Sequence, residues 1–234
     1  MTEQSRGAGI AFVVAHLVLV SAAGAAVILS GPVALGRGTI VTIASIAVVC
    51  GVVLRPAGLR AFGSGIVGIA ARVACIGIGV IVAIAIIGSA HLPADLLLST
   101  TAAAVVLALV LDQFAAAFDP IGNGYGASLV ALTVVGVAST IPLWLGPAID
   151  TPSAPPFLAD GVVWASPLSC LSAVAGYDYL RSAWFYAHTP LGGLRYSLPD
   201  PFTTTLAYGV LGTVLWIAAK WRATPMLRST TRNH

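Results

Sequence analysis

Residues 66–88 read IVGIAARVACIGIGVIVAIAIIG, an apolar stretch in which Arg72 is the one charged side chain. A helix rises about 1.5 Å per residue, so roughly 20 apolar residues cross a hydrocarbon layer of about 30 Å. This stretch is long enough to do so. Gly68 and other small residues in it also allow a neighbouring helix to approach closely. The stretch is therefore predicted to be a membrane-spanning helix.

The whole chain has the same apolar character. Of its 234 residues, 58% are hydrophobic and 8% are charged. So few charged side chains cannot cover the surface of a water-soluble protein of this size. We expect an all-α integral membrane protein that forms a single transmembrane domain over residues 1–234, with the lipid bilayer and no nucleic acid as a partner.

Six apolar segments are separated by connections rich in Gly, Pro and Asp, which break helices and form turns. The predicted spans are residues 9–30, 36–54, 66–88, 95–113, 127–146 and 202–221. The first is expected to be a retained span, because it is longer than the apolar core of a signal peptide and shows no clear cleavage site. The connection over 147–201 is much longer than the others and forms a separate outer region.

The distribution of Lys and Arg predicts the orientation, because basic residues near span ends are retained in the cytoplasm. With the amino terminus inside, basic residues are more numerous on the cytoplasmic side than on the outer side. The cytoplasmic ones are Arg6, Arg55, Arg60, Lys220, Arg222, Arg228 and Arg232, and the outer ones are Arg37, Arg181 and Arg195. Arg72 is expected to extend to the inner surface. The prediction is a multi-pass protein of the cell membrane with both termini cytoplasmic.

The outer region contains a second apolar piece, VVWASPLSCLSAVAG at residues 162–176. Pro167 interrupts this piece, and the piece is too short to cross the membrane easily. A re-entrant hairpin or an interfacial helix fits it better than a seventh span. The region between spans five and six is therefore predicted to be helical and to lie against the outer membrane surface.

The next residues, YDYLRSAWFYAH, are predicted to form an interfacial helix, because Tyr and Trp favour the depth of the lipid headgroups. Tyr177, Trp184 and His188 fall on one face of this helix. Asp178 and Arg181 are three residues apart and would be neighbours on it. One interpretation is a membrane anchor, and the functional alternative is an outer gate or substrate exit formed with the proline-broken piece.

The six spans, the cytoplasmic termini and the long outer connection before the last span resemble the permease subunits of ABC-2-type exporters. Ser166-Pro167-Leu168 resembles the Asn-Pro-Leu-like start of the outer region in that family. The resemblance implies short re-entrant or interfacial helices on the outer face and no catalytic residue in this chain. It also implies a homodimer or a second permease chain, and a separate ATP-binding subunit that docks on the second connection, where Arg55 and Arg60 lie.

The sequence has no GxxxxGK[ST] phosphate loop, so the energy for export would have to come from another subunit. A non-catalytic scaffold or assembly subunit of a membrane complex is an alternative function. A membrane-embedded enzyme that uses His188, Asp178, Tyr177 and Arg181 at the outer surface is a further one. On one helix, however, Asp178 and His188 would lie almost three turns apart.

Two ionisable residues are expected at bilayer depth, where a charge costs several kcal/mol unless it is paired or hydrated. His16 lies in the first span; it is interpreted as a structural residue whose neutral imidazole hydrogen-bonds a Ser or a carbonyl of another helix, with a proton relay or a metal ligand as the alternative. Asp112 ends the fourth span, and a contact of Asp112 and Gln113 with a cytoplasmic partner is an alternative interpretation of these two residues. Asp119 is expected to open a turn. The histidines and cysteines show no ligand spacing, so neither a metal nor another cofactor is expected.

Overall fold

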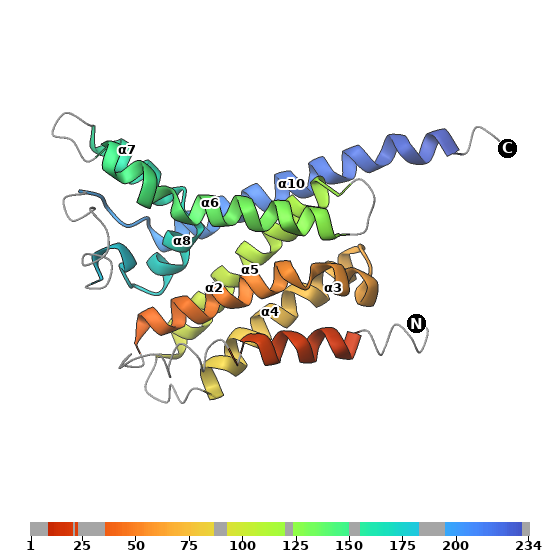
Figure 1. Ribbon diagram of the computed structural model, residues 1–234, viewed down its shortest axis with the longest axis horizontal. Helices are drawn as coiled ribbons and strands as arrows, with labels where there is room; N and C mark the ends of the chain where they lie inside the picture. The colour runs from red at the N-terminus through yellow and green to blue at the C-terminus, as the bar shows by residue number, and fades with distance from the viewer. Residues whose placement is uncertain are drawn as a thin grey trace.

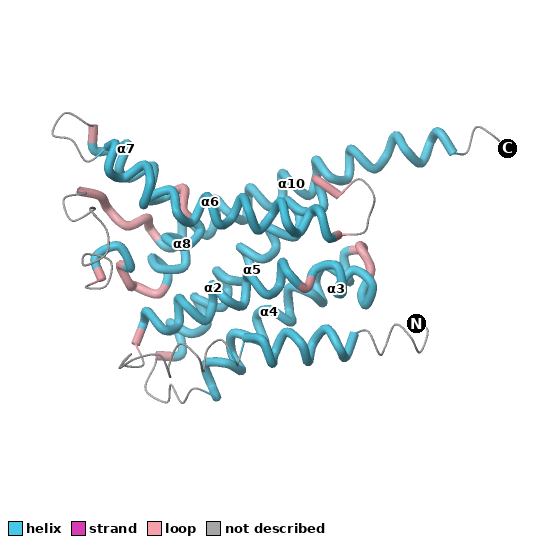
Figure 2. Tube along the Cα trace, viewed as in Figure 1, coloured by secondary structure: helices cyan, strands magenta, loops and turns pink. Residues whose placement is uncertain are grey.

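The computed structural model describes residues 9–20, 22, 36–86, 93–119, 124–149, 155–182 and 195–230. All regular secondary structure over these residues is helical, and Figure 2 shows helices joined by loops. The prediction of an all-α protein is confirmed for this part of the chain.

The helices follow the apolar segments of the sequence. In chain order they are helix Gly9–Val20, α2 (Arg37–Val53), α3 (Arg55–Phe62), α4 (Ile66–Ile86), α5 (Ala94–Ala117), α6 (Tyr125–Ile149), α7 (Pro156–Trp164), α8 (Pro167–Val174), the 3₁₀ turn η1 (Tyr179–Arg181) and α10 (Pro201–Thr230). The last five predicted spans coincide with α2, α4, α5, α6 and α10, although α10 continues beyond residue 221. The first predicted span is helical over Gly9–Val20, and most of its remaining residues lie outside the described part.

Four helical segments are individually long and apolar enough to cross a membrane: Ile66–Ile84, Ala94–Ala117, Tyr125–Ile149 and Pro201–Trp221. Two bent pairs satisfy the same criterion when each pair is taken together. These are α2 with α3, bent by 62°, and α7 with α8, bent by 89°. The chain therefore has four to six candidate spans, as a multi-pass membrane protein does. The predicted number of six is reached when α7 and α8 count as one span and the short helix Gly9–Val20 does not.

Successive long helices run in opposite directions along the molecule (Figure 1). Helix Gly9–Val20, α4 and α6 begin at the end of the molecule where α3, α5 and α10 finish. We call this the arginine-rich end, because Arg55, Arg60 and Arg72 lie towards it. The opposite end carries α7, α8, η1 and the segment 195–200.

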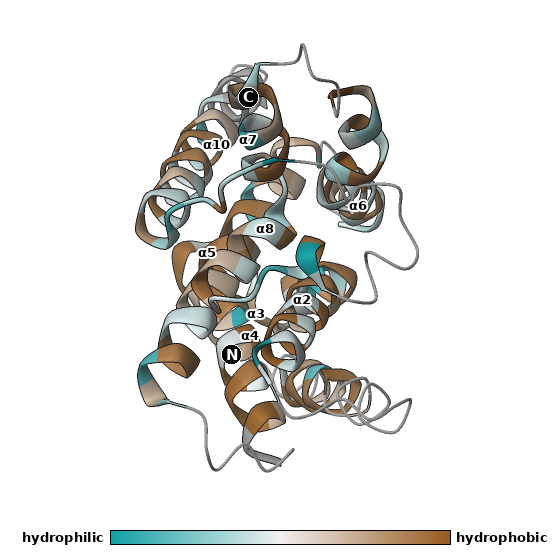
Figure 3. Cartoon of the chain, turned by 90° about the vertical axis from the view of Figure 1, so that its left-hand side faces the viewer, coloured by the Kyte–Doolittle hydropathy of each residue, from teal (hydrophilic) through white to brown (hydrophobic). Residues whose placement is uncertain are grey.

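The core lies where α2, α4 and α5 pack together. Small buried residues allow these helices to come close, among them Ala44 and Ala47 of α2, Ala83 of α4, and Ala104 and Ala108 of α5. Half of the α4 span is buried inside the protein and 44% of the α5 span, compared with 17% for α6 and 11% for α10. α6 and α10 therefore form an outer flank, and Figure 3 shows hydrophobic colour over much of both helices.

Pro167 breaks the apolar piece of the outer region, as predicted. Ser166 has an extended backbone, and its hydroxyl accepts a hydrogen bond from the amide of Ser169 at 3.4 Å. Proline suits the first turn of a helix and disfavours the helical conformation in the residue before it. One helix therefore ends at Trp164, and a new helix starts at Pro167 in another direction.

The α-helix predicted to follow Gly176 is wrong for residues 177–182, which contain only the 3₁₀ turn η1. Gly176 has a φ of +60°, a conformation that glycine adopts easily and that ends the preceding helix. The carboxylate of Asp178 then accepts a hydrogen bond from the amide of Arg181 at 3.3 Å. This local bond satisfies the backbone without an α-helix.

Candidate docking site at the arginine-rich end

α3 is a short helix that turns away from α2 at Leu54. The break follows from Pro56, since proline inside a continuous helix removes a backbone hydrogen bond and clashes with the preceding turn. Gly63, with a φ of +77°, ends α3 and allows the chain to enter α4. The second connection is thus a helix with its own direction at the arginine-rich end (Figure 1).

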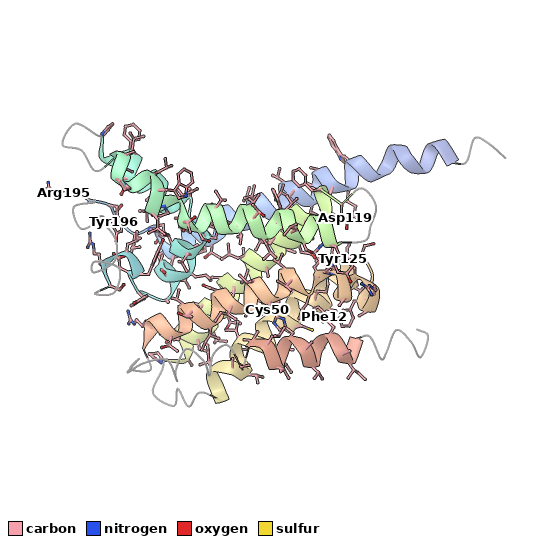
Figure 4. All side chains as sticks on the ribbon, viewed as in Figure 1. Phe12, Cys50, Asp119, Tyr125, Arg195 and Tyr196 are labelled. Atoms are coloured by element: carbon pink, nitrogen blue, oxygen red, sulfur yellow. The ribbon has the colours of Figure 1, made fainter. Side chains whose placement is uncertain are left out.

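Arg55 fixes the inner side of α3 to α5. Its side chain is 4% exposed, and its Nε donates to Oδ1 of Asp112 at 3.2 Å. Its Nη1 donates to Oδ2 of Asp119 at 3.3 Å. Figure 4 shows Asp119 at the arginine-rich end, beyond the last turn of α5. Arg55 is therefore a buried structural contact and does not reach the surface.

Arg72 approaches the same carboxylate from α4. Its Nη2 lies 2.8 Å from Oδ2 and 3.1 Å from Oδ1 of Asp112, and its Nη1 donates to the carbonyl of Gly63. Gln113 adds a hydrogen bond from Nε2 to Oδ2 of Asp112 at 3.3 Å. The expectation that Arg72 extends to the inner surface is wrong, because its side chain is 4% exposed and ion-paired.

We call Arg55, Arg72, Asp112 and Asp119 the ionic cluster. Its two positive and two negative side chains balance, and they come from α3, α4 and the end of α5. Burying each ion costs several kcal/mol, and only good geometry with further hydrogen bonds offsets that cost. Asp112 meets this condition, because each of its oxygens accepts from more than one donor. The ionic cluster therefore holds three helices at fixed positions.

The outer side of α3 has a different character. Arg60 is exposed; its guanidinium carbon lies 5.5 Å from the ring centroid of Tyr125, and its Nη2 donates to the hydroxyl of Tyr125. Ala57 is also exposed on α3. A guanidinium above an aromatic ring is a favourable cation–π contact. α3 thus presents an arginine and a small residue outwards.

The ionic cluster is suited to holding helices together more than to chemistry. Its carboxylates already accept hydrogen bonds from arginines, so neither is free to act as a general base. Among the described residues no three His, Cys, Asp or Glu side chains are grouped as metal ligands. The described part of this end therefore combines a buried structural cluster with the exposed residues Ala57 and Arg60 of α3.

His16 lies apart from this site. It is fully buried in helix Gly9–Val20, and its ring lies beside Gly79 of α4 and 6.3 Å from the ring centroid of Phe12. Neither ring nitrogen has a hydrogen-bond partner within the described residues. His16 therefore packs against α4, but the expected hydrogen bond to a Ser or a carbonyl of another helix is not made within the described residues, and no partner for a proton relay is present in this part of the chain.

The predicted residues of the outer region lie at the opposite end. Asp178 and Arg181 form the expected ion pair at 3.5 Å. Tyr196, which the sequence did not indicate, donates to Oδ1 of Asp178 at 2.6 Å, and its ring centroid lies 5.1 Å from the Arg181 guanidinium carbon. Figure 4 shows Tyr196 and Arg195 at this end. Trp184 and His188 lie outside the described residues, so the predicted enzyme centre stays a prediction.

Tyr177 connects this region to α2. Its ring lies against Gly38, where an added Cβ would come within 2.9 Å of the ring. Arg37 donates from Nη1 to the carbonyl of Gly176 at 3.0 Å. The outer region is thus packed on the first turn of α2, and Pro167 sets the direction of the helix that leads to it.

Sequence reasoning found Arg55 and Asp112 separately and did not pair them. Asp119 was interpreted as a turn residue, and Tyr125 was not considered. One signal was present, because a buried arginine and a buried aspartate in neighbouring spans have to neutralise each other. No protein-family model, curated protein or solved structure matches the chain.

Proposed function

We propose that this chain is the membrane-spanning subunit of an ABC-type exporter, and that a separate ATP-binding subunit docks on α3 from the cytoplasm. The observation that carries the proposal is the environment of α3. Its outer side is exposed at Ala57 and Arg60, and its inner side is held by the buried Arg55. The excess of basic residues at the arginine-rich end supports a cytoplasmic position for that end.

The contacts of the ionic cluster support a path for mechanical coupling. A displacement of α3 acts directly on Asp112 and Asp119 through Arg55. Arg72 of α4 pairs with the same Asp112, so α4 is connected to α3 and α5. Breaking a buried ion pair costs about 3–5 kcal/mol, so these helices move together more readily than they separate. α5 in turn packs on α10 and α8. A motion imposed at α3 thereby reaches the opposite end of the protein.

In this proposal α7 and α8 form a re-entrant segment at the outer surface. The chain enters α7 after the end of α6 and continues from α8 to η1 at the end opposite α3 (Figure 1). The contacts of Asp178 with Arg181 and Tyr196 join η1 to the segment 195–200. The substrate pathway would then lie between two copies of this chain or between this chain and a second permease chain.

Charge reversal at Arg60 tests the docking. The Arg60→Glu variant should retain on the order of tenfold less ATP-binding subunit when the protein is purified from its native membrane in mild detergent, because like-charge contacts at an interface cost several kcal/mol. Arg60→Lys should retain most of it. Arg195→Glu is the matched control, since Arg195 is exposed at the opposite end.

Co-purification of ATP-binding subunit that is equal for Arg60→Glu and the unmodified protein would refute docking on α3. Purification of an intact complex without any ATP-binding subunit would refute the exporter function and favour the scaffold alternative.

A further inference from the structure

An apolar groove lies between α4, α5 and α10. It has a volume of about 400 Å³, within the range of roughly 300–1,000 Å³ typical of small-molecule sites. Its walls include Ile66, Ile69 and Val73 of α4, Leu109 of α5 and Trp216 of α10. The groove is thus large enough for a ligand and is built mainly from hydrocarbon side chains.

The groove follows from the packing of two helices on a third. α4 and α10 both pack on α5. Gly212 brings α10 close to α5, since a Cβ added there would lie 3.1 Å from Cγ2 of Val110. α10 therefore lies against α5 near this point, and a channel remains between α10 and α4.

The level of the groove within a bilayer indicates the chemistry of its occupant. All of its walls belong to candidate spans, so in a bilayer the groove would open within the hydrocarbon layer. Gln113 is a polar wall residue, but it is 2% exposed and its amide already donates to Asp112. A water-soluble ligand would find almost no hydrogen-bond partners here, whereas a lipid acyl chain needs none.

The charge near the groove indicates the headgroup. Lys220 is exposed and lies four residues after Trp216, so it projects from the same side of α10, one turn nearer the arginine-rich end. A lysine at this position extends its ammonium to headgroup depth. A positive side chain at this depth favours a negative headgroup.

We propose that the groove binds an acyl chain of an anionic phospholipid from the leaflet at the arginine-rich end, with its headgroup next to Lys220. The proposed site requires the protein to be embedded in a bilayer, and it does not depend on the exporter function. It differs from general lipid contact because one chain occupies a defined channel and one basic residue selects the headgroup.

Trp216 reports on the occupant, because bromine on an acyl chain quenches tryptophan fluorescence on contact. We would keep Trp216 as the single tryptophan by changing the four others to Phe. The full chain is then reconstituted in phosphatidylcholine vesicles with increasing fractions of dibrominated phosphatidylglycerol or dibrominated phosphatidylcholine. Half-maximal quenching should require about fivefold less of the anionic lipid, and Lys220→Gln should remove this preference.

Two alanines of α4 provide a matched pair of variants. Ala70 lines the groove, whereas Ala74 is exposed one turn further along and does not line it. Ala70→Phe should fill the channel and weaken the quenching of Trp216. Ala74→Phe should leave it unchanged. Size-exclusion chromatography in detergent checks that both variants remain folded.

Equal quenching curves for the two lipids would overturn the choice of headgroup. Equal effects of Ala70→Phe and Ala74→Phe would overturn the acyl-chain site. A Trp216 that neither brominated lipid quenches would also refute it, and would assign the groove to a second copy of the chain or to another protein.

Discussion

Asp112 is the residue through which α3, α4 and α5 are connected. Its carboxylate accepts hydrogen bonds from Arg55 and Arg72, which come from two other helices, and from Gln113 beside it. Both arginines are 4% exposed. The negative charge of Asp112 is therefore needed to compensate two guanidinium groups that have little access to water.

Replacement of Asp112 by Asn tests this role. Asn keeps the size of the side chain but removes the charge, which leaves Arg55 and Arg72 with Asp119 as the remaining carboxylate of the ionic cluster. We expect a loss of about 3–5 kcal/mol in stability, measured as a lower midpoint of thermal unfolding in detergent.

The same substitution at Asp178 is the control. Its partner Arg181 has a side chain that is 56% exposed, so we expect a loss of at most about 1 kcal/mol. Losses of equal size in the two variants would contradict the role of Asp112.

The pair of helices α3 and α4 depends on close contact at Gly68. A Cβ added to Gly68 would overlap the backbone carbonyl oxygens of Phe62 and Gly63. Backbone atoms at the end of α3 cannot move aside as a flexible side chain can. Glycine at this position therefore allows the end of α3 to pack directly against the first turn of α4.

Replacement of Gly68 by Ala should displace the end of α3 and cost about 1–3 kcal/mol. Gly136 provides the comparison, because it lies inside α6 with nothing within 4 Å of an added Cβ. Gly136→Ala should stabilise the protein by up to about 1 kcal/mol. Thermal midpoints that shift in the same direction for both variants would argue against the contact at Gly68.

The elements differ in how far the sequence could predict them. The helices of the last five predicted spans were predictable, because uninterrupted apolar length is a strong signal for a helix. The helix predicted after Gly176 was wrong over residues 177–182, because the pattern of tyrosines suited a helical face while the side chain of Asp178 bonded the local backbone instead. The ionic cluster could not be predicted from a pattern along the sequence, since Arg55 and Arg72 lie 57 and 40 residues away from Asp112.

At the scale of the whole molecule, the two opposite ends carry different structures that connect the long helices. The arginine-rich end carries α3 and the ionic cluster, and the other end carries α7, α8 and the segment 195–200 (Figure 1). The apolar flanks of α6 and α10 lie between these ends. The proposed function requires the first end to be cytoplasmic and the second to be external.

Cysteine labelling tests this arrangement in a background in which Cys50, Cys75 and Cys170 are replaced by Ser. A cysteine at Ala57 should react with an impermeant maleimide only in permeabilised cells. Cysteines at Pro155 and at Arg195 should both react in intact cells, because α7 and α8 are proposed to enter and leave on one side. Labelling of the last two from opposite sides would show that this pair crosses the membrane.

α10 has 30 residues, and a helix of this size is about 45 Å long, compared with about 30 Å for the hydrocarbon layer. Its candidate span ends at Trp221, and the helix continues to Thr230. In a bilayer, this overhang would make the protein responsive to the thickness of the membrane. A thicker bilayer would draw part of the overhang into the lipid, and a thinner one would increase the tilt of α10 against α5.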